Sequence, residues 1–231
     1  MNPKPAIASG LEVPPEWWSR LGHDLRGPIS PMRMGLQMLK SGRASAAEQN
    51  EAVQLIDCQV DQLLASIEDI SELLRMNAPG FALSFAVDDL NLVIDALSGR
   101  SSLRRTLEGR GQQLQCSAAA GTVSAQHDPQ RLVLLLEYLI ARAAVRAAPG
   151  ATLRLLLHGG PAEAEFQLSG ASGPLSDDPD LAHVAGSDMS HCEERQARAL
   201  RMREIVRLSG AVVELSGDGA WSLRLPARDA S

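Results

Sequence analysis

Two stretches near the start of the chain carry apolar residues at steps of three and four, which is the spacing of an amphipathic helix. In the first stretch, residues 16–39, these positions are Leu21, Leu25, Ile29, Met32, Leu36 and Leu39. In the second they are Val53, Ile56, Val60, Leu63, Leu64, Ile67, Ile70 and Leu74. Ser45 with Glu48 predicts a capping box at the start of the second helix, and MNAPG, residues 76–80, predicts its end. We therefore expect an antiparallel helical hairpin over residues 16–80, which a second copy would complete to a four-helix bundle.

After residue 80 short strand-like runs alternate with longer helical patterns. Helices are predicted over residues 87–107, 128–147 and 193–208. Strands are predicted over residues 112–117, 121–126, 152–158, 164–170, 211–215 and 220–226. This order indicates an α+β fold, in which an α/β sandwich domain with one mixed sheet, residues 81–231, follows the hairpin. The Pro-rich residues 1–15 are expected to form a flexible segment.

The composition narrows the class of protein. Of the 231 residues 45% are hydrophobic, which is enough for a real core, and the net charge of -6 disfavours nucleic acid as a partner. No apolar run has membrane-spanning length, and prolines stand where a signal peptide would need an apolar core, so a cytoplasmic location is expected. Cys58, Cys116 and Cys192 have no metal or redox spacing and are expected to be unpaired thiols, and His191 beside Cys192 is too little for a metal site.

The sequence LGHDLRGPIS, residues 21–30, places chemistry on the first helix. His23 lies opposite the apolar stripe, so we expect it to be exposed, where a neutral imidazole can act as a nucleophile. Asp24 can accept the imidazole proton or fix its tautomer. Pro28 removes the N–H that would bond the carbonyl of Asp24, which predicts a bend after the His-Asp pair, and Gly27 lets a bulky partner come close.

The run LGHDLRGPISPMRMGLQML, residues 21–39, resembles the H-box of two-component histidine kinases, H-[DE]-L-R-[TN]-P-L. The hairpin resembles the dimerisation and histidine-phosphotransfer domain of that family. Residues 128–157 and 205–226 resemble the opening and the end of its ATP-binding domain. The resemblance covers residues 17–226 and implies that His23 is the phosphoacceptor.

The family's nucleotide motifs are altered in three places. Arg142 stands where the family has the asparagine that holds magnesium, and a guanidinium cannot ligate a cation. The run SGASG, from Ser169 to Gly173, replaces D-x-G-x-G, so a hydroxyl stands where a carboxylate would accept from adenine. Gln196 and Arg198 replace the glycines of G-x-G-L, which obstructs a close backbone approach to phosphates. ATP binding in the usual way is therefore not expected, and no cofactor is predicted.

The cations near the altered motifs allow another interpretation. Arg142, Arg146, Arg195, Arg198, Arg201 and Arg203 could bind phosphates by charge alone. We favour a salt-bridged helix face formed with Glu193, Glu194 and Glu204.

A histidine without a working kinase site resembles the dimeric histidine phosphotransferases of bacterial phosphorelays. In that reading His23 passes a phosphoryl group between receiver domains of response regulators or of a hybrid histidine kinase, and the receiver supplies Mg²⁺. Receiver docking is expected at Arg26, Pro28, Ile29, Met32 and Arg33. Gly27 stands where the family often has Thr or Asn for phosphatase chemistry. The alternatives are a divergent cytoplasmic kinase that autophosphorylates His23 from ATP, or a non-catalytic kinase-binding module.

Overall fold

The computed structural model describes residues 25–76, 78–159, 164–186 and 197–226. The chain divides into two compact units. One comprises residues 1–81 with 192–201, and the other comprises residues 82–191 with 202–231. The dividing line falls inside α8 (Ala197–Ser209).

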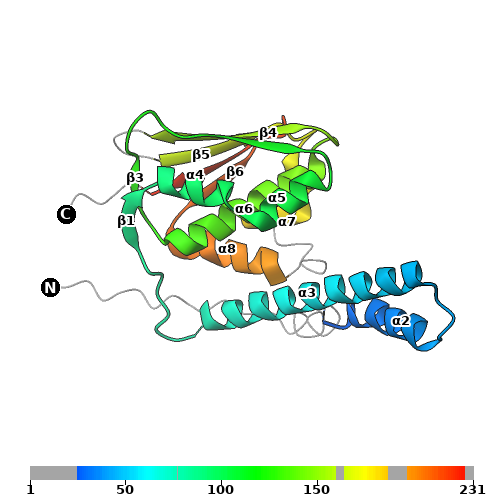
Figure 1. The fold of residues 1–231 in the computed structure, drawn as a ribbon. Helices are drawn as coiled ribbons and strands as arrows, with labels where there is room; N and C mark the ends of the chain where they lie inside the picture. Colours follow the sequence, from blue (N-terminus) through cyan, green and yellow to red (C-terminus); the bar gives the residue numbers. More distant parts are fainter. Residues whose placement is uncertain (1–24, 77, 160–163, 187–196, 227–231) are drawn as a thin grey trace. The chain divides into compact units, whose positions relative to one another are not determined.

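The described part of the first unit contains the predicted helical hairpin, α2 (Ile29–Lys40) and α3 (Ala46–Met76) (Figure 1). Leu25 and Arg26 are helical, and the chain makes a turn at Gly27 and Pro28 before α2 begins. The predicted interruption is therefore present, as expected for a proline that cannot donate to the carbonyl four residues earlier.

The hairpin is closed by a tight contact between its two helices. A Cβ atom at Gly35 would lie 3.0 Å from Ile56 Cγ1 and 3.2 Å from the carbonyl oxygen of Ala52. Ala52 is buried on the facing turn of α3. The absence of a side chain at Gly35 thus lets the backbones of α2 and α3 approach closely.

The capping box predicted at the start of α3 is confirmed. The Ser45 N–H donates to Glu48 Oε2 at 2.7 Å, and the Glu48 N–H donates to Ser45 Oγ at 3.4 Å. These bonds satisfy two backbone N–H groups at the helix start that have no partner within the helix. Hydrogen bonds from the Ser45 side chain and backbone lower the pKa of the Glu48 carboxyl.

We expect Ser45→Ala to destabilise the hairpin by about 1 kcal/mol, the usual cost of a lost N-cap. Urea unfolding followed by circular dichroism measures the loss, with Ser66→Ala, inside α3, as the control. Because the folded-state pKa of Glu48 is lowered, its contribution is present above the unfolded pKa and lost as the pH falls through the folded pKa. The difference between wild type and Ser45→Ala should therefore shrink in acid, and a difference that stays constant would contradict this account.

The second unit is built on a five-stranded mixed sheet with strand order β2-β4-β5-β7-β6. β2 and β4 are parallel, and the other neighbours are antiparallel. The strands are β2 (Gln113–Ser117), β4 (Thr152–Gly159), β5 (Ala164–Ser169), β6 (Val212–Leu215) and β7 (Trp221–Leu225). Alternate side chains of the central strands are buried, which is the pattern of a sheet covered on one face.

Helices cover that face of the sheet (Figure 1). They are α4 (Asn91–Ser98), α5 (Ser101–Glu108), α6 (Pro129–Arg146) and α7 (Pro179–Val184), and η1 (Leu175–Asp177) is a short 3-10 turn before α7. The core contains Leu139 and Ile140 of α6, Phe166 of β5 and Trp221 of β7, all almost fully buried. The predicted α+β fold, a helical hairpin followed by a sandwich domain, is confirmed.

The single helix predicted over residues 87–107 is wrong. Residues 86–89 form β1 (Ala86–Asp89), which pairs antiparallel with β3 (Ser124–His127) in a separate two-stranded ladder. The helical part is split between α4 and α5, because the backbone of Arg100 is extended. Gly99 precedes that break, and glycine is a poor helix former.

Candidate functional site

The docking residues predicted beside the H-box gather on one helix face. Arg26, Ile29 and Arg33 line a surface hollow of about 440 Å³, which Ser30, Met34 and Gln37 complete. The steps of three and four between these positions place them on one side of the helix. His23 and Asp24 lie outside the described residues.

Two of the predicted docking residues need correction. Pro28 is buried, so it shapes the turn before α2 and offers no side chain to a partner. Met32 is half-buried and does not line the hollow. Of the predicted docking residues, the hollow therefore contains the guanidinium groups of Arg26 and Arg33 and the apolar side chain of Ile29.

The hairpin leaves large apolar side chains in contact with solvent. On α2 and α3 the exposed set is Ile29, Met34, Leu36, Met38, Val53, Leu64, Ile67 and Leu74. Most of these residues belong to the helical stripes that predict a bundle. A single hairpin does not bury its own apolar faces, and such faces are typical of association sites.

Arg142, which stands at the family's magnesium-ligand position, is held by two aspartates. Its Nη2 donates to Asp178 Oδ2 at 2.5 Å, and its Nη1 lies 3.5 Å from Asp180 Oδ2. Burial acts to lower the pKa of Arg142, but the hydrogen bond and charge of Asp178, with Asp180, outweigh it and raise that pKa. The guanidinium is therefore charged throughout the accessible pH range and forms an ion pair with two buried carboxylates of the same unit.

Asp178 is the residue that joins this ion pair to the backbone. It is 3% exposed, and its Oδ1 accepts from the N–H groups of Asp180 and Leu181 at the start of α7. Sequence reasoning did not predict α7 or this partner. The signal was available, since Asp178 followed by Pro179 is a typical helix start.

The SGASG run lies beside the same end of α6. Ser169 is the last residue of β5, and the Ser172 N–H donates to the Arg146 carbonyl oxygen at 3.2 Å. Gly170 has a φ of +108°, and a Cβ there would lie 2.5 Å from the Thr152 carbonyl oxygen, so this position requires glycine. Gly173, also with positive φ, faces open space. The structure thus brings Arg142 and this run to one region of the second unit.

The second glycine box is only partly described. Gln196 lies outside the described residues, and Arg198 lies near the start of α8. Glu193, Glu194 and Arg195 also lie outside the described residues, so their part of the expected salt-bridged face stays a prediction. Among the described arginines, Arg142 donates to Asp178, Arg201 donates to Asp69 at 2.8 Å, and Arg203 donates to the Val184 carbonyl oxygen. Glu204 pairs with Arg207, which was not among the predicted arginines.

The described residues were also searched for free cysteines, metal-binding clusters and membrane-spanning helices. Cys58 and Cys116 are free thiols. In the described ranges no cluster of three or more His, Cys, Asp or Glu side chains could hold a metal ion. Across the same ranges, none of the helices combines the length and the apolar character needed to cross a membrane.

Comparisons with known proteins find one matching family model and several similar folds. Residues 16–79 match the family model of the His Kinase A (phospho-acceptor) domain. The structure is similar to the Acinetobacter baumannii histidine kinase AdeS, with a TM-score of 0.64 and 13% identity, over 90% of this chain and 98% of that chain. No curated protein sequence gives a significant match.

Two solved complexes, that of the histidine kinase ThkA and that of ShkA, have a similar fold. ThkA in complex with the response regulator protein TrrA gives a TM-score of 0.69 at 12% identity, over 93% of this chain and 62% of that chain. Full-length ShkA in complex with AMPPNP gives a TM-score of 0.60 at 18% identity, over 95% of this chain and 47% of that chain. The chain thus spans about half to two thirds of these two proteins.

The class of protein follows from the fold and the family match together. The chain has the two-part architecture of histidine kinases, a helical hairpin followed by an ATP-binding-like domain. Residues 16–79 match the model of the phospho-acceptor domain, and the whole chain has the fold of solved histidine kinases, so both comparisons support the resemblance to that family.

Proposed function

We propose that this protein is a histidine phosphotransfer protein of a two-component phosphorelay, with His23 as the phosphoacceptor. The observation that carries the proposal is the Arg142 ion pair with Asp178 and Asp180. By the family resemblance Arg142 stands where the asparagine ligand of magnesium would be, and its guanidinium is already bound by two carboxylates of this chain. The sequence that matches the phospho-acceptor domain keeps its histidine. A chain of this kind needs its phosphoryl group from another protein rather than from ATP.

The reaction requires little chemistry from this chain beyond a nucleophile and its position. The unprotonated ring nitrogen of His23 attacks the phosphorus of a receiver's aspartyl phosphate, a P–N bond forms, and the P–O bond to the receiver carboxylate breaks. Asp24 can take or hold the remaining ring proton. Transfer onward is the reverse step, in which a second receiver's carboxylate attacks and the P–N bond breaks. The receiver's own Mg²⁺ offsets the phosphoryl charge.

Receiver docking is assigned to the hollow that Arg26, Ile29 and Arg33 line. Two guanidinium groups complement the acidic, phosphorylated surface of a receiver, and Ile29 supplies an apolar contact. The similarity to ThkA, whose solved structure is a complex with a response regulator, supports this choice of partner.

A homodimer is the second part of the proposal, because the exposed apolar faces of α2 and α3 need a partner. We expect the protein to be a dimer by light scattering, and the double variant Leu64→Asp with Ile67→Asp to be monomeric. In a four-helix bundle the two new carboxylates of each copy would be buried against the other copy, which costs free energy. The matched control is Gln62→Asp, an exposed polar position on α3. A control that dissociates equally would assign the effect to net charge.

The proposed function is tested by asking whether the protein takes its phosphoryl group from a phosphorylated receiver domain or from ATP. The full chain is incubated with a ³²P-phosphorylated receiver domain in one tube and with γ-labelled Mg-ATP in another. Acid-labile label from the receiver alone is the expected result. Label from ATP alone would instead make the protein a divergent histidine kinase.

The divergent kinase is the second candidate, and the shared fold with ShkA, solved with AMPPNP, favours it. Titration calorimetry with Mg-AMPPNP separates the two candidates, because the phosphotransferase reading predicts no binding at millimolar nucleotide. A third candidate, a non-catalytic kinase-binding module, takes no label in either tube.

A further inference from the structure

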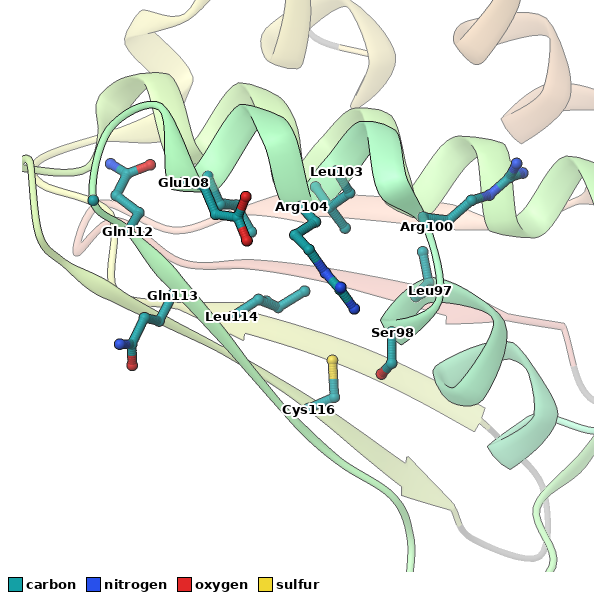
Figure 2. Close-up of a pocket in the computed structure, with 12 residues that line it drawn as sticks. Leu97, Ser98, Arg100, Leu103, Arg104, Glu108, Gln112, Gln113, Leu114 and Cys116 are labelled. Atoms are coloured by element: carbon teal, nitrogen blue, oxygen red, sulfur yellow. The ribbon is translucent and has the colours of Figure 1, made fainter.

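A groove on the second unit lies apart from both regions described above. It runs between α5 and β2, holds about 670 Å³, and is lined by Leu97, Ser98, Arg100, Leu103, Arg104, Leu107, Glu108, Gly111, Gln112, Gln113, Leu114 and Cys116 (Figure 2). Three buried leucines and the half-buried Leu114 form its apolar part. Its lining includes neither Arg142 nor the SGASG run, and its size is that of a binding site.

One wall of this α5–β2 groove is an edge strand. Among the strands that the structure describes, β2 stands at the end of the five-stranded sheet and pairs with β4 alone. The Gln113 N–H donates to the Ala151 carbonyl oxygen, on the β4 side of the ladder. Because backbone groups alternate in direction along a strand, those of Leu114 and Cys116 point away from β4, and a free row of donors and acceptors borders the groove.

The edge strand β2 lacks the usual features that prevent an edge from pairing with another strand. Its five residues, QLQCS, include no charge and no proline, which are the common devices against strand pairing. At the opposite edge β6 carries Glu214, which is ion-paired with Arg224 of β7. The difference indicates that β2 is left open to a strand partner.

The other wall carries two arginines, one of which has no ion pair within the described part of the chain. Arg100 lies 3.5 Å from the buried carboxylate of Glu137, which also accepts from the Ser102 hydroxyl. Arg104, one turn further along α5, has no ion pair with any residue in the described ranges, and its side chain extends over the groove toward Ser98 and Cys116 (Figure 2). Glu108, one turn further along α5, also lines the groove.

We propose that the α5–β2 groove binds an extended acidic peptide segment of a partner protein, which adds to β2 as a sixth strand of the sheet. Backbone hydrogen bonds to the free edge supply affinity, and alternate side chains enter the groove. An acidic side chain near Cys116 pairs with Arg104, and an apolar side chain two residues away contacts the leucines. Glu108 disfavours a second acidic side chain near its own carboxylate.

A peptide suits this groove better than a small molecule does. The groove is open to solvent along its length, and a compact ligand would leave the free edge of β2 unpaired. A strand occupies both the edge and the apolar floor with one repeating geometry. This inference does not depend on the phosphotransfer activity, because no residue of the groove takes part in it.

The proposal is tested by selecting a displayed library of random octapeptides on the immobilised full-length protein. We expect enriched peptides to carry Asp or Glu two residues from an apolar side chain. Arg104→Glu should weaken a selected peptide by about tenfold or more, since a charged hydrogen bond is lost, and a new selection on that variant should favour basic peptides. Arg105→Glu, the same change on α5 outside the groove, should alter affinity less than about twofold.

Cys116 reports whether the peptide lies in the groove. Burial raises the pKa of the Cys116 thiol, against the effect of a hydrogen bond with Ser98, so we expect slow alkylation of this thiol. In a chain with Cys58→Ser and Cys192→Ser, a selected peptide should slow alkylation of Cys116, and N-methylation of alternate peptide amides should abolish binding. The proposal is overturned if no peptide is enriched, if enriched peptides bind Arg104→Glu as well as wild type, or if Cys116 is not protected.

Discussion

Replacing His23 by alanine is expected to abolish acid-labile labelling of the protein by a phosphorylated receiver domain. Alanine has no lone pair that could attack phosphorus, so the loss should be complete within detection rather than partial. Because the sequence predicts an exposed His23, we expect His23→Ala to leave the unfolding free energy within about 0.5 kcal/mol of wild type. The measurement is the rate of ³²P transfer from the receiver, with unfolding in urea as the check on folding.

Two further variants make this result specific. His158→Ala changes an exposed histidine near the end of β4 and should transfer at the wild-type rate. Asp24→Asn should slow transfer by about a hundredfold, the lower range of general acid–base effects, without preventing it. If His23→Ala still accepted label, or if His158→Ala lost it, the phosphoacceptor would be another residue and the proposed function would fail.

The hairpin could be predicted from the sequence because its signals are local. The steps of three and four, the Ser45–Glu48 capping box and the MNAPG stop all act within a few residues of one another. The ladder between β1 and β3 was missed for the opposite reason. Val87 pairs with Gln126, 39 positions later, and nothing in the local pattern of residues 86–89 indicates that partner.

The same distinction holds at the altered nucleotide site. Counting along the helix that begins after Asp128 identified Arg142 as a residue unable to hold magnesium. Its actual partners, Asp178 and Asp180, lie on a short helix that was not predicted, and their proximity depends on how the sheet and α6 pack. Sequence reasoning therefore predicted that this position cannot hold magnesium, which stays a prediction, but it did not predict the ion pair that the structure shows there.

That ion pair carries the second large expected effect, because Arg142→Ala leaves the carboxylate of Asp178 buried and without its guanidinium. We expect a loss of about 2–4 kcal/mol in the free energy of unfolding, somewhat below the range for fully buried pairs because Arg142 is partly exposed. Urea unfolding measures it, with Arg154→Ala on the exposed side of β4 as the control. The double-mutant cycle with Asp178→Asn should recover part of the loss, since the unpaired charge is then removed.

Arg142→Asn restores the residue type that the family uses and tests what the ion pair means for function. It should be destabilised like Arg142→Ala and should still show no binding of Mg-AMPPNP, because Ser169 remains where the family has an adenine-binding carboxylate. The loss of nucleotide binding would then be spread over several positions, with Asp178 and Asp180 adding negative charge against a triphosphate. Nucleotide binding gained by this one change would mean instead that Arg142 alone blocks an otherwise competent kinase site, and the phosphotransferase proposal would lose its main support.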